Sequence, residues 1–385
     1  MSSSSRRDVL RAGLVGLGFG SGGLGRLAAR GDDLAAQAGL IVRSSMPLDA
    51  ETPVEAFDRF LTPNDLFFVR SHFGPPATTL APWKLEIDGL VNHPISLSLD
   101  GLRSRFENVT LPAVLQCSGN GRAYYKPTIA GVGWDRGAVG NAEWSGVRLS
   151  DILTRAGIKP EAAHVQLGGA DLPPNPKTPA FFRSIPLTRA LHSGTIVATH
   201  MNGEPLPRLH GGPIRLVVPG WAGNHWIKWL RQVTVSRDEA PGFYMQTGYR
   251  IPKVPTPPEV TLKPADLVPV TTLNVKSLIA RPLEGAVLPA GRVEVRGVAW
   301  TGDGTVDRVE VATGPNAPWQ IARLEGPPRA GTWTTWIFAW EAPPGVHTLR
   351  ARATDTLGQT QGETTPWNRS GYLWNGIDRV TCEVI

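Results

Sequence analysis

The sequence is poor in cysteine, in charge and in long hydrophobic runs. Its 385 residues include two cysteines, Cys117 and Cys382, and none of the Cys-x-x-Cys or Cys/His spacings typical of zinc and iron–sulfur sites. Charged residues make up 19% of the chain and hydrophobic residues 41%, which excludes wholesale disorder and predicts packed cores. Once the N-terminal segment is set aside, no apolar run reaches the roughly 18 residues of a spanning helix, so we expect no membrane insertion.

Basic clusters and haem-attachment motifs are also missing. The net charge is +6, but the lysines and arginines are scattered and form no run, so nucleic acid is a poor candidate ligand. A small anion or an acidic protein partner suits this mildly basic chain better. No Cys-x-x-Cys-His sequence occurs, and we therefore expect no haem.

The N-terminus has the three-part layout of an export signal. Arg6 and Arg7 precede an uncharged, glycine-rich stretch at residues 12–25, and the Ala-Gln-Ala at residues 36–38 supplies a cleavage site. An amphipathic helix is the alternative, but glycine disfavours it, since each costs up to about 1 kcal/mol relative to alanine. Residues 1–38 are therefore predicted to be a twin-arginine signal peptide, which carries folded cargo to the periplasm.

Glycine and proline punctuate the rest of the chain. With 43 Gly and 35 Pro they form about a fifth of the sequence, which favours short strands and many loops. Residues 39–250 mix predicted strands with a helix over residues 150–157, which Ser150 would cap and Gly157 would close. Because no regular βαβ rhythm appears, the class is predicted to be α+β. The predicted strands cover residues 83–87, 164–167, 195–199 and 214–218.

A second domain is predicted after a proline-rich break. Residues 251–265 hold five prolines, which cannot join a central strand or helix, and we interpret them as a linker. Residues 266–385 alternate apolar and polar residues between turns, which predicts an all-β, immunoglobulin-like sandwich. Five tryptophans are expected to fill its core or an interface: Trp300, Trp319, Trp333, Trp336 and Trp340.

The two cysteines lie in different settings. Cys382 shares one face of an alternating strand with Val380 and Val384, which predicts a buried core residue. Cys117 lies on a glycine-rich turn close to Arg122, where a cation would give its thiol a low pKa. A disulfide between them is the alternative in an exported protein, but the loop and the terminal strand lie far apart in the sequence.

Several clusters in the first domain carry side chains suited to chemistry. Arg70 and His72 lie two residues apart at a strand end and so on the same side, and the turn from Cys117 to Arg122 and the segment around Trp134 follow. The fourth cluster runs from residue 201 to residue 229 and contains His210, Arg215 and Lys228. Taken singly, each of these residues has an ordinary structural explanation. Taken together, these residues place a thiolate in cationic surroundings, which suits a metal that acts on an oxyanion. The remaining ligands of the metal would then come from a cofactor.

These segments resemble the sulfite oxidase family of molybdenum–molybdopterin enzymes, and most of all bacterial periplasmic sulfite dehydrogenases. The resemblance rests on FFVRSH, LQCSGNGR, the Trp134 segment ending GAVGNAEWSGVRL, MNGEPLPRLHGGPIRLVVPG and KWL, which together run through nearly all of residues 64–235. It implies a molybdopterin-binding catalytic domain over residues 39–250 and an immunoglobulin-like dimerisation domain over residues 266–385. The mature protein is accordingly expected to be a homodimer.

The resemblance also implies roles for individual residues. Cys117 would be the thiolate ligand of molybdenum. The anion pocket would be lined by Arg70, Arg122, Trp134 and His72, with His200 as a further catalytic candidate. The pterin and its phosphate would be held by His210, Arg215 and Lys228, with Phe68, Arg70, His72, Cys117 and Asn202 as further cofactor contacts. The implied reaction is oxidation of sulfite to sulfate, with electrons passing to an external c-type cytochrome.

The sequence departs from the family pattern at two places. Thr199-His200 stands where sulfite-oxidising members usually have Tyr-Glu, so His200 either replaces the phenol as a hydrogen-bond donor or faces away. A pocket arginine that animal members take from the second domain has no obvious counterpart near residues 333–340. Reduction of an S- or N-oxide by the same cofactor therefore stays open. So do a thiol hydrolase, with Cys117 as nucleophile and His72 or His210 as base, and a non-catalytic anion-binding protein.

Overall fold

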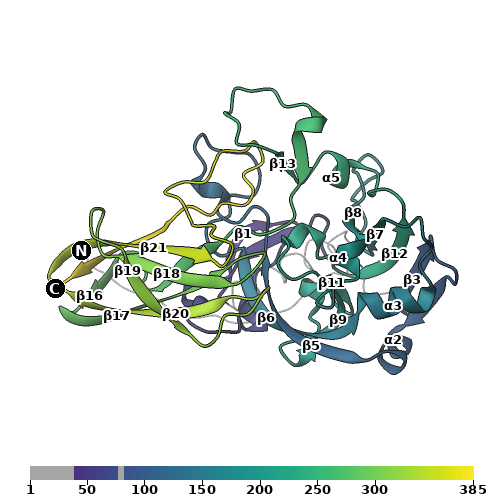
Figure 1. Cartoon of the computed structure of the whole chain (residues 1–385), viewed down its shortest axis with the longest axis horizontal. Coiled ribbons are helices and arrows are strands. Elements are labelled where there is room, and N and C mark those ends of the chain that lie inside the picture. Colours follow the sequence, from purple (N-terminus) through teal and green to yellow (C-terminus); the bar gives the residue numbers. More distant parts are fainter. Residues whose placement is uncertain (1–38, 77–81) are drawn as a thin grey trace, which may run out of the picture.

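The chain folds into two β-rich parts that pack against each other in this computed structural model (Figure 1). The structure describes residues 39–76 and 82–385, so the predicted signal peptide at residues 1–38 lies outside it. Within the described ranges, no helix combines the length and the apolar character needed to cross a membrane. The C-terminal strands form the elongated body on the left of Figure 1, and the earlier elements form the rounder body on the right.

One sheet of the first part carries the segment that ends at Cys117. Its order is β10-β9-β6-β5, with β11 added to β9, and all of its pairings are antiparallel. The long pair β5 and β6 leads directly into the cysteine turn, because β5 ends one residue before Cys117. The strands are β5 (Asn108–Gln116), β6 (Val139–Arg148), β9 (Ile196–Met201), β10 (Glu204–Pro205) and β11 (Arg215–Val217).

The second sheet of the first part is mixed. Its order is β4-β3-β12-β7-β8, in which β12 runs parallel to β3 and antiparallel to β7. Residues of both sheets contribute to one hydrophobic core, which contains Leu85, Ile87, Trp144 and Val197. The strands are β3 (Lys84–Gly89), β4 (Ile95–Ser98), β7 (His164–Gly169), β8 (Phe182–Pro186) and β12 (Leu230–Ser236).

The α-helices are short, as expected of a chain this rich in glycine and proline. They are α2 (Leu99–Arg105), α3 (Leu149–Ala156), α4 (Leu187–Ala190) and α5 (Phe243–Gln246). The predicted cap of α3 is wrong at one end, because Arg148 occupies the N-cap position and the Ser150 hydroxyl lies 3.2 Å from Asp151 Oδ1 instead. Gly157 closes the helix as predicted, with a left-handed φ of 72° that glycine adopts without strain.

Two hairpins sit beside the sheets of the first part. β1 (Ile41–Ser45) pairs with β2 (Leu48–Glu51), and Ala50 of β2 exchanges backbone hydrogen bonds with Val69, next to Arg70. β13 (Arg250–Pro252) pairs with β14 (Leu267–Pro269) and so closes the base of the proline-rich loop at the top of Figure 1. Both hairpins anchor segments whose neighbours reach the cavity described below.

The C-terminal part is the predicted all-β sandwich. Its strand order is β15-β17-β20-β19-β18-β21-β22-β16, and β19 pairs with both β18 and β20, which links the two sheets. Alternate side chains fill the space between them, and Cys382 is buried there as predicted. The strands are β15 (Lys276–Arg281), β16 (Ala286–Leu288), β17 (Gly291–Trp300), β18 (Val306–Ala312), β19 (Gln320–Glu325), β20 (Thr334–Ala342), β21 (Gly345–Asp355) and β22 (Asp378–Val384).

The tryptophans of the second part divide between core and surface. Trp300, Trp333, Trp336 and Trp340 are buried, as expected from their size and apolar rings. Trp319 is not in the core: it precedes β19, stays partly exposed, and lies under two guanidinium groups, those of Arg350 at 4.9 Å and Arg352 at 4.3 Å. Cation–π contact explains its position better than core packing.

The second part holds the cysteine turn of the first part in place. The Trp300 indole N–H donates to Gln116 Oε1 at 2.8 Å, and the Leu373 amide donates to the carbonyl of Ser118 at 2.8 Å. Cys117 therefore lies between two residues that the C-terminal part fixes. Both cysteines are free, so no disulfide joins the two parts.

Candidate active site

An open cavity lies beside the cysteine turn, and its empty volume is about 720 Å³ when the open solvent at its mouth is included. Segments far apart in the sequence meet there: residues 68–72, the turn after β5, the loop after β7, and the 209–229 region. The strand predicted to end at residues 70–72 is wrong, because only Val69 of this segment forms an isolated bridge, with Ala50. The chemically active side chains on its wall are Arg70, His72, Cys117, Asp171, His210, Arg215, Lys228 and Tyr249. Cations outnumber carboxylates among these groups, so the cavity suits an anion.

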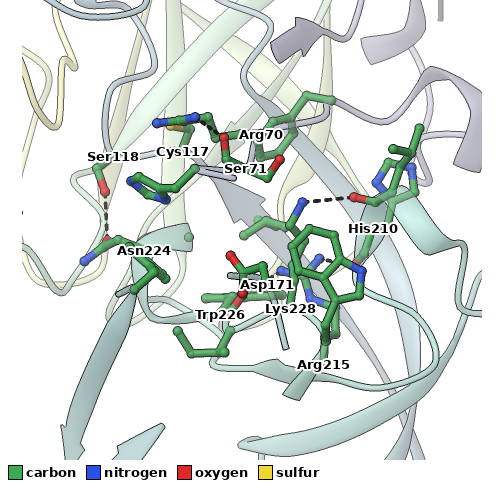
Figure 2. A pocket seen from close by; sticks show the side chains of 18 of the residues that line it. Arg70, Ser71, Cys117, Ser118, Asp171, His210, Arg215, Asn224, Trp226 and Lys228 are labelled. Atoms are coloured by element: carbon green, nitrogen blue, oxygen red, sulfur yellow. Dashed lines mark hydrogen bonds between the residues drawn. The ribbon is translucent and has the colours of Figure 1, made fainter. Parts of the chain in front are cut away.

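Cys117 and Arg70 lie on one side of the cavity (Figure 2). The Cys117 amide donates to the carbonyl of Ala138 at 2.9 Å, and its side chain is half-buried. Burial raises the pKa of the Cys117 thiol and outweighs the opposing charge of Arg70, so the low pKa expected from the sequence is not seen. Arg70 donates to Asp49 Oδ1 at 3.2 Å and to the carbonyl of Ser71, which holds its guanidinium at the cavity wall.

His72 is held in an aromatic cage. Its ring stacks on Phe181 with centroids 4.3 Å apart and meets the edge of Tyr244 at 4.8 Å. Burial, reinforced by the charges of Arg70 and other nearby cations, holds the pKa of His72 well below its usual range. The imidazole is therefore neutral.

His210 and Arg215 form the opposite wall. His210 Nε2 lies 2.9 Å from the carbonyl of Asn64, which can only accept, so this nitrogen carries the proton. Burial lowers the pKa of His210 to about 3, and the ring is neutral. Arg215 is 3% exposed and donates to the carbonyls of His210 at 2.8 Å and Trp226 at 3.1 Å.

Lys228 reaches the same wall through a close backbone approach. Gly211 has a left-handed φ of 106°, and a Cβ there would come within 2.9 Å of Lys228 Cβ, so the His-Gly-Gly turn needs its glycine. Lys228 Nζ donates to the carbonyl of Leu209 at 3.0 Å and lies 4.4 Å from the Trp229 ring centroid. Burial, with the charge of Arg215, lowers the pKa of Lys228 to about 7.

The residues present fit an anionic cofactor. Buried charges are normally paired, yet Arg215 and Lys228 hydrogen-bond only to neutral carbonyls and form no ion pair among the described residues. Asp171, whose pKa burial raises to about 6, acts on Lys228 only at longer range. The unbalanced cations suit a phosphate group, and the Cys117 thiol suits a soft metal. Over residues 39–76 and 82–385, no three His, Cys, Asp or Glu side chains gather closely enough to hold a metal ion.

Comparison with known proteins agrees with this chemistry. Residues 72–244 match the family described as "Oxidoreductase molybdopterin binding domain", and residues 268–384 match "Mo-co oxidoreductase dimerisation domain". The sulfite oxidase of Gallus gallus is 37% identical over 351 residues, covering 87% of this chain and 76% of that protein. The chain belongs to the sulfite oxidase family. The mitochondrial sulfite oxidase of Macaca fascicularis is 35% identical over 91% of this chain and 66% of its own length.

A solved structure supports the family's fold as a whole. The sulfane dehydrogenase SoxCD from Paracoccus pantotrophus matches with a TM-score of 0.75 and 27% identity, covering 88% of this chain and 85% of that one. The likeness extends through both β-rich parts, so the predicted architecture, a sulfite-oxidase-type molybdopterin domain followed by a β-sandwich, is confirmed. The family is one of molybdopterin-dependent oxidoreductases, so the chain is an enzyme of that kind.

The cavity brings together most of the residues singled out from the sequence. Seven of them line its wall: Phe68, Arg70, His72, Cys117, His210, Arg215 and Lys228. Four others lie elsewhere: Arg122, Trp134, His200 and Asn202.

The positions of Arg122 and Trp134 follow from their partners. Arg122 donates to the carbonyls of Ser370 at 3.0 Å and Val132 at 2.8 Å, so its guanidinium joins the two parts, and its charge acts on the Cys117 thiol. It still packs against Gly119 of the cysteine turn. Trp134 is 1% exposed and belongs to the hydrophobic core, and its carbonyl accepts a hydrogen bond from the Ala123 amide at 3.1 Å.

His200 and Asn202 are placed by the end of β9. His200 lines a separate, open hollow with Thr199 and Ser145, and its Nδ1 lies 2.8 Å from the Thr199 hydroxyl. Asn202 has a left-handed φ of 51° and donates to the carbonyl of Thr62 at 2.9 Å, which fixes the turn into β10. Neither side chain reaches the cavity.

The structure adds wall residues that the sequence patterns did not reveal. Asp171 follows β7, and Asn224 accepts a hydrogen bond from the Ser118 hydroxyl at 2.8 Å, next to the cysteine. Tyr249 comes from the segment before β13. Asn224 falls within the 201–229 cluster but is not among its predicted site residues, and Asp171 and Tyr249 stand in no motif with recognisable spacing. Only the folding of separate loops onto one cavity identifies these two.

Proposed function

We propose that this protein oxidises sulfite to sulfate with a molybdenum–pterin cofactor held in the cavity. One observation carries the proposal: a lone thiol, Cys117, faces a cavity together with Arg70 and with the unbalanced cations Arg215 and Lys228. A thiolate ligand, an anion-binding wall and a separate oxyanion-binding guanidinium are the three requirements of this reaction. The sulfite oxidases that the chain resembles act on the same substrate.

The roles of the side chains follow from their positions. Cys117 would ligate the metal, and Arg215 and Lys228 would neutralise the anionic cofactor. His210 is neutral, so it adds no positive charge to this site. When bound, a molybdenum–pterin cofactor supplies the two-electron redox centre for oxygen-atom transfer. Arg70 would draw the oxyanion to the Cys117 side, and its bond to Asp49 keeps the guanidinium oriented before substrate arrives.

The cellular setting is part of the proposal. We infer that residues 1–38 direct export of the folded, cofactor-loaded protein to the periplasm by the twin-arginine route. Electrons would then pass to an external c-type cytochrome, with no haem in the chain itself. The matched dimerisation domain supports a homodimer, which light scattering would test: a monomer mass alone would contradict it.

Metal content and substrate tests decide the proposal in that order. Protein from a host that makes the cofactor should contain close to one molybdenum per chain by elemental mass spectrometry. It should then reduce cytochrome c with sulfite, and not oxidise a reduced dye with a sulfoxide or N-oxide. Metal-loaded protein that is active only in the second assay would show that the enzyme reduces an S- or N-oxide and does not oxidise sulfite.

The likeness to SoxCD favours a second substrate class, sulfane sulfur. Thiosulfate, a small anion that carries sulfane sulfur, should be compared with sulfite under the same conditions.

A further inference from the structure

Arg183 is a buried cation that has no role in the site described above. It lies on β8, is fully buried, and does not line the cavity itself. Burial lowers the pKa of Arg183 to about 10, so the guanidinium is still charged at neutral pH. Within residues 39–76 and 82–385 it forms no ion pair, because Glu239, whose charge acts on it, is bonded to Arg250 at 2.8 Å. A buried charge of this kind destabilises the fold unless an opposite charge comes close.

The hydrogen bonds of Arg183 leave its charge unbalanced. The guanidinium donates to the carbonyl of Tyr244, and its second terminal nitrogen lies 3.0 Å from His225 Nε2. The same His225 nitrogen lies 2.9 Å from the carbonyl of Val270, which can only accept, so it satisfies one of its two neighbours and not both. Burial holds the pKa of His225 well below its usual range, so the imidazole is neutral. The Nε of Arg183 has no acceptor among the described residues, and its partners are all neutral.

A single ring separates Arg183 from the cavity. The guanidinium carbon lies 5.5 Å from the ring centroid of Tyr249, which lines the cavity. Burial raises the pKa of Tyr249 and the charge of Arg70 opposes this effect, so both guanidinium groups act on the same ring. Burial and the charges of Arg70 and Lys228 lower the pKa of His72, and the charge of Arg183 adds to them. The field of Arg183 therefore reaches the Arg70 side of the cavity through protein rather than through water, where it is weakly screened.

We propose that Arg183 sets the charge preference of the site: its unbalanced positive charge behind the Tyr249 ring favours a doubly charged oxyanion over a singly charged one beside Arg70. The inference rests on the proposed function for the class of ligand, because the product sulfate carries two negative charges. Arg183 is a specificity-determining residue in this arrangement. It acts through space and contacts neither the substrate nor the cofactor.

The proposal predicts a fixed relation between two ligands. The Coulomb energy is proportional to the charge of the bound anion, so loss of the Arg183 charge should cost a dianion twice the free energy that it costs a monoanion. The fold-change for sulfate should then be about the square of the fold-change for nitrate. We expect about threefold weaker binding of nitrate and about tenfold weaker binding of sulfate. A loss of packing alone gives no reason for this relation.

Two substitutions separate the charge of Arg183 from its hydrogen bond. Arg183→Gln removes the charge and keeps an N–H donor for the Tyr244 carbonyl, whereas Arg183→Lys keeps the charge. Holoprotein of equal molybdenum content is titrated calorimetrically with sodium sulfate and with sodium nitrate. Arg183→Gln should show the two losses above, and Arg183→Lys should stay within about threefold of the wild type for both anions.

Arg189→Gln is the matched control. Arg189 also donates to a carbonyl, that of Pro219, and lies over an aromatic ring, that of Trp221, but outside the cavity. Its variant should bind both anions within about twofold of the wild type, since its charge is not directed at the cavity.

Three results would overturn the inference and leave the proposed function intact: wild-type sulfate affinity in Arg183→Gln, equal losses for sulfate and nitrate, or the same loss in Arg183→Lys as in Arg183→Gln. If Arg183→Gln does not fold, Glu239→Gln probes the same charge, because removing the opposing carboxylate should tighten sulfate binding more than nitrate binding; unchanged affinities would overturn the inference. Metal-loaded wild-type protein without sulfite oxidation would refute the proposed function. The comparison of sulfate with nitrate would still decide whether the charge of Arg183 acts on a bound anion.

Discussion

Replacing Arg215 by methionine should disable cofactor retention with little effect on the cofactor-free fold. Burial lowers the pKa of Arg215 to about 9, which corresponds to about 5 kcal/mol of destabilisation by the buried charge. This destabilisation is fully present below pH 9, where the folded chain keeps the proton, and is relieved only as pH rises above about 9. Removing the guanidinium at neutral pH removes this free-energy cost of the buried charge.

Lost hydrogen bonds oppose this gain. The carbonyls of His210 and Trp226, bonded at 2.8 and 3.1 Å, would lose their donors, and each orphaned acceptor costs about 1–3 kcal/mol. Together the two effects change the free energy of unfolding of the cofactor-free protein by between a gain of about 3 and a loss of about 1 kcal/mol. With an anionic cofactor present, the same substitution removes a charge-assisted contact of about 3 kcal/mol, or about 100-fold in affinity.

Two measurements on Arg215→Met follow. Urea unfolding of protein made without the cofactor gives the first quantity, and molybdenum per chain after extensive dialysis gives the second. Arg189→Met is the matched control, because Arg189 also donates to a carbonyl, that of Pro219, and lies over a tryptophan ring but outside the cavity. A loss above about 4 kcal/mol in the cofactor-free variant, or full molybdenum retention, would refute the reasoning.

Three further substitutions test neighbouring parts of the site. Cys117→Ser should abolish turnover while circular dichroism and released pterin stay near wild-type levels, and full activity would end the proposed ligand role. Trp300→Phe leaves the buried Gln116 Oε1 without its donor and should lower the free energy of unfolding, measured in urea, by about 1–3 kcal/mol. An unchanged free energy would show that this bond does not hold the cysteine turn in place. Burial lowers the pKa of Lys228 to about 7, so cofactor-free wild-type protein should gain stability relative to Lys228→Met as pH rises from about 7 towards 10.5. The same difference in free energy of unfolding between wild type and variant at about pH 6 and at about pH 9 would contradict this.

Local patterns predicted the elements of the fold well where one physical rule dominates. Alternation located the sandwich strands, because a half-buried strand shows its period directly in the sequence. Local patterns did not decide the outcome where neighbours compete: the Ser150 hydroxyl bonds to Asp151 rather than to the helix end, and Trp319 packs against arginines while the other four tryptophans are buried. Such outcomes depend on partners that become adjacent only after folding.

The site shows the same division. The motifs around Arg70, Cys117 and His210 indicated a metal cofactor that acts on an oxyanion, and these residues do meet at one cavity. Arg122 and His200 carry equally suitable side chains but turn elsewhere, Arg122 toward Ser370 and His200 toward Thr199. The residue type determines which chemistry a side chain can perform, whereas the packing around the side chain determines where it points.

By itself the sequence determined the family, the two-part architecture and the residue types able to hold an anionic molybdenum cofactor. Those features depend on composition, periodicity and motif spacing, which are local along the chain. The tertiary structure alone decided that Tyr249, from the segment before β13, shares a wall with Arg70 and rests on a ring of the C-terminal part. No local rule reports such contacts, because they arise when two separately patterned domains bury their surfaces against each other.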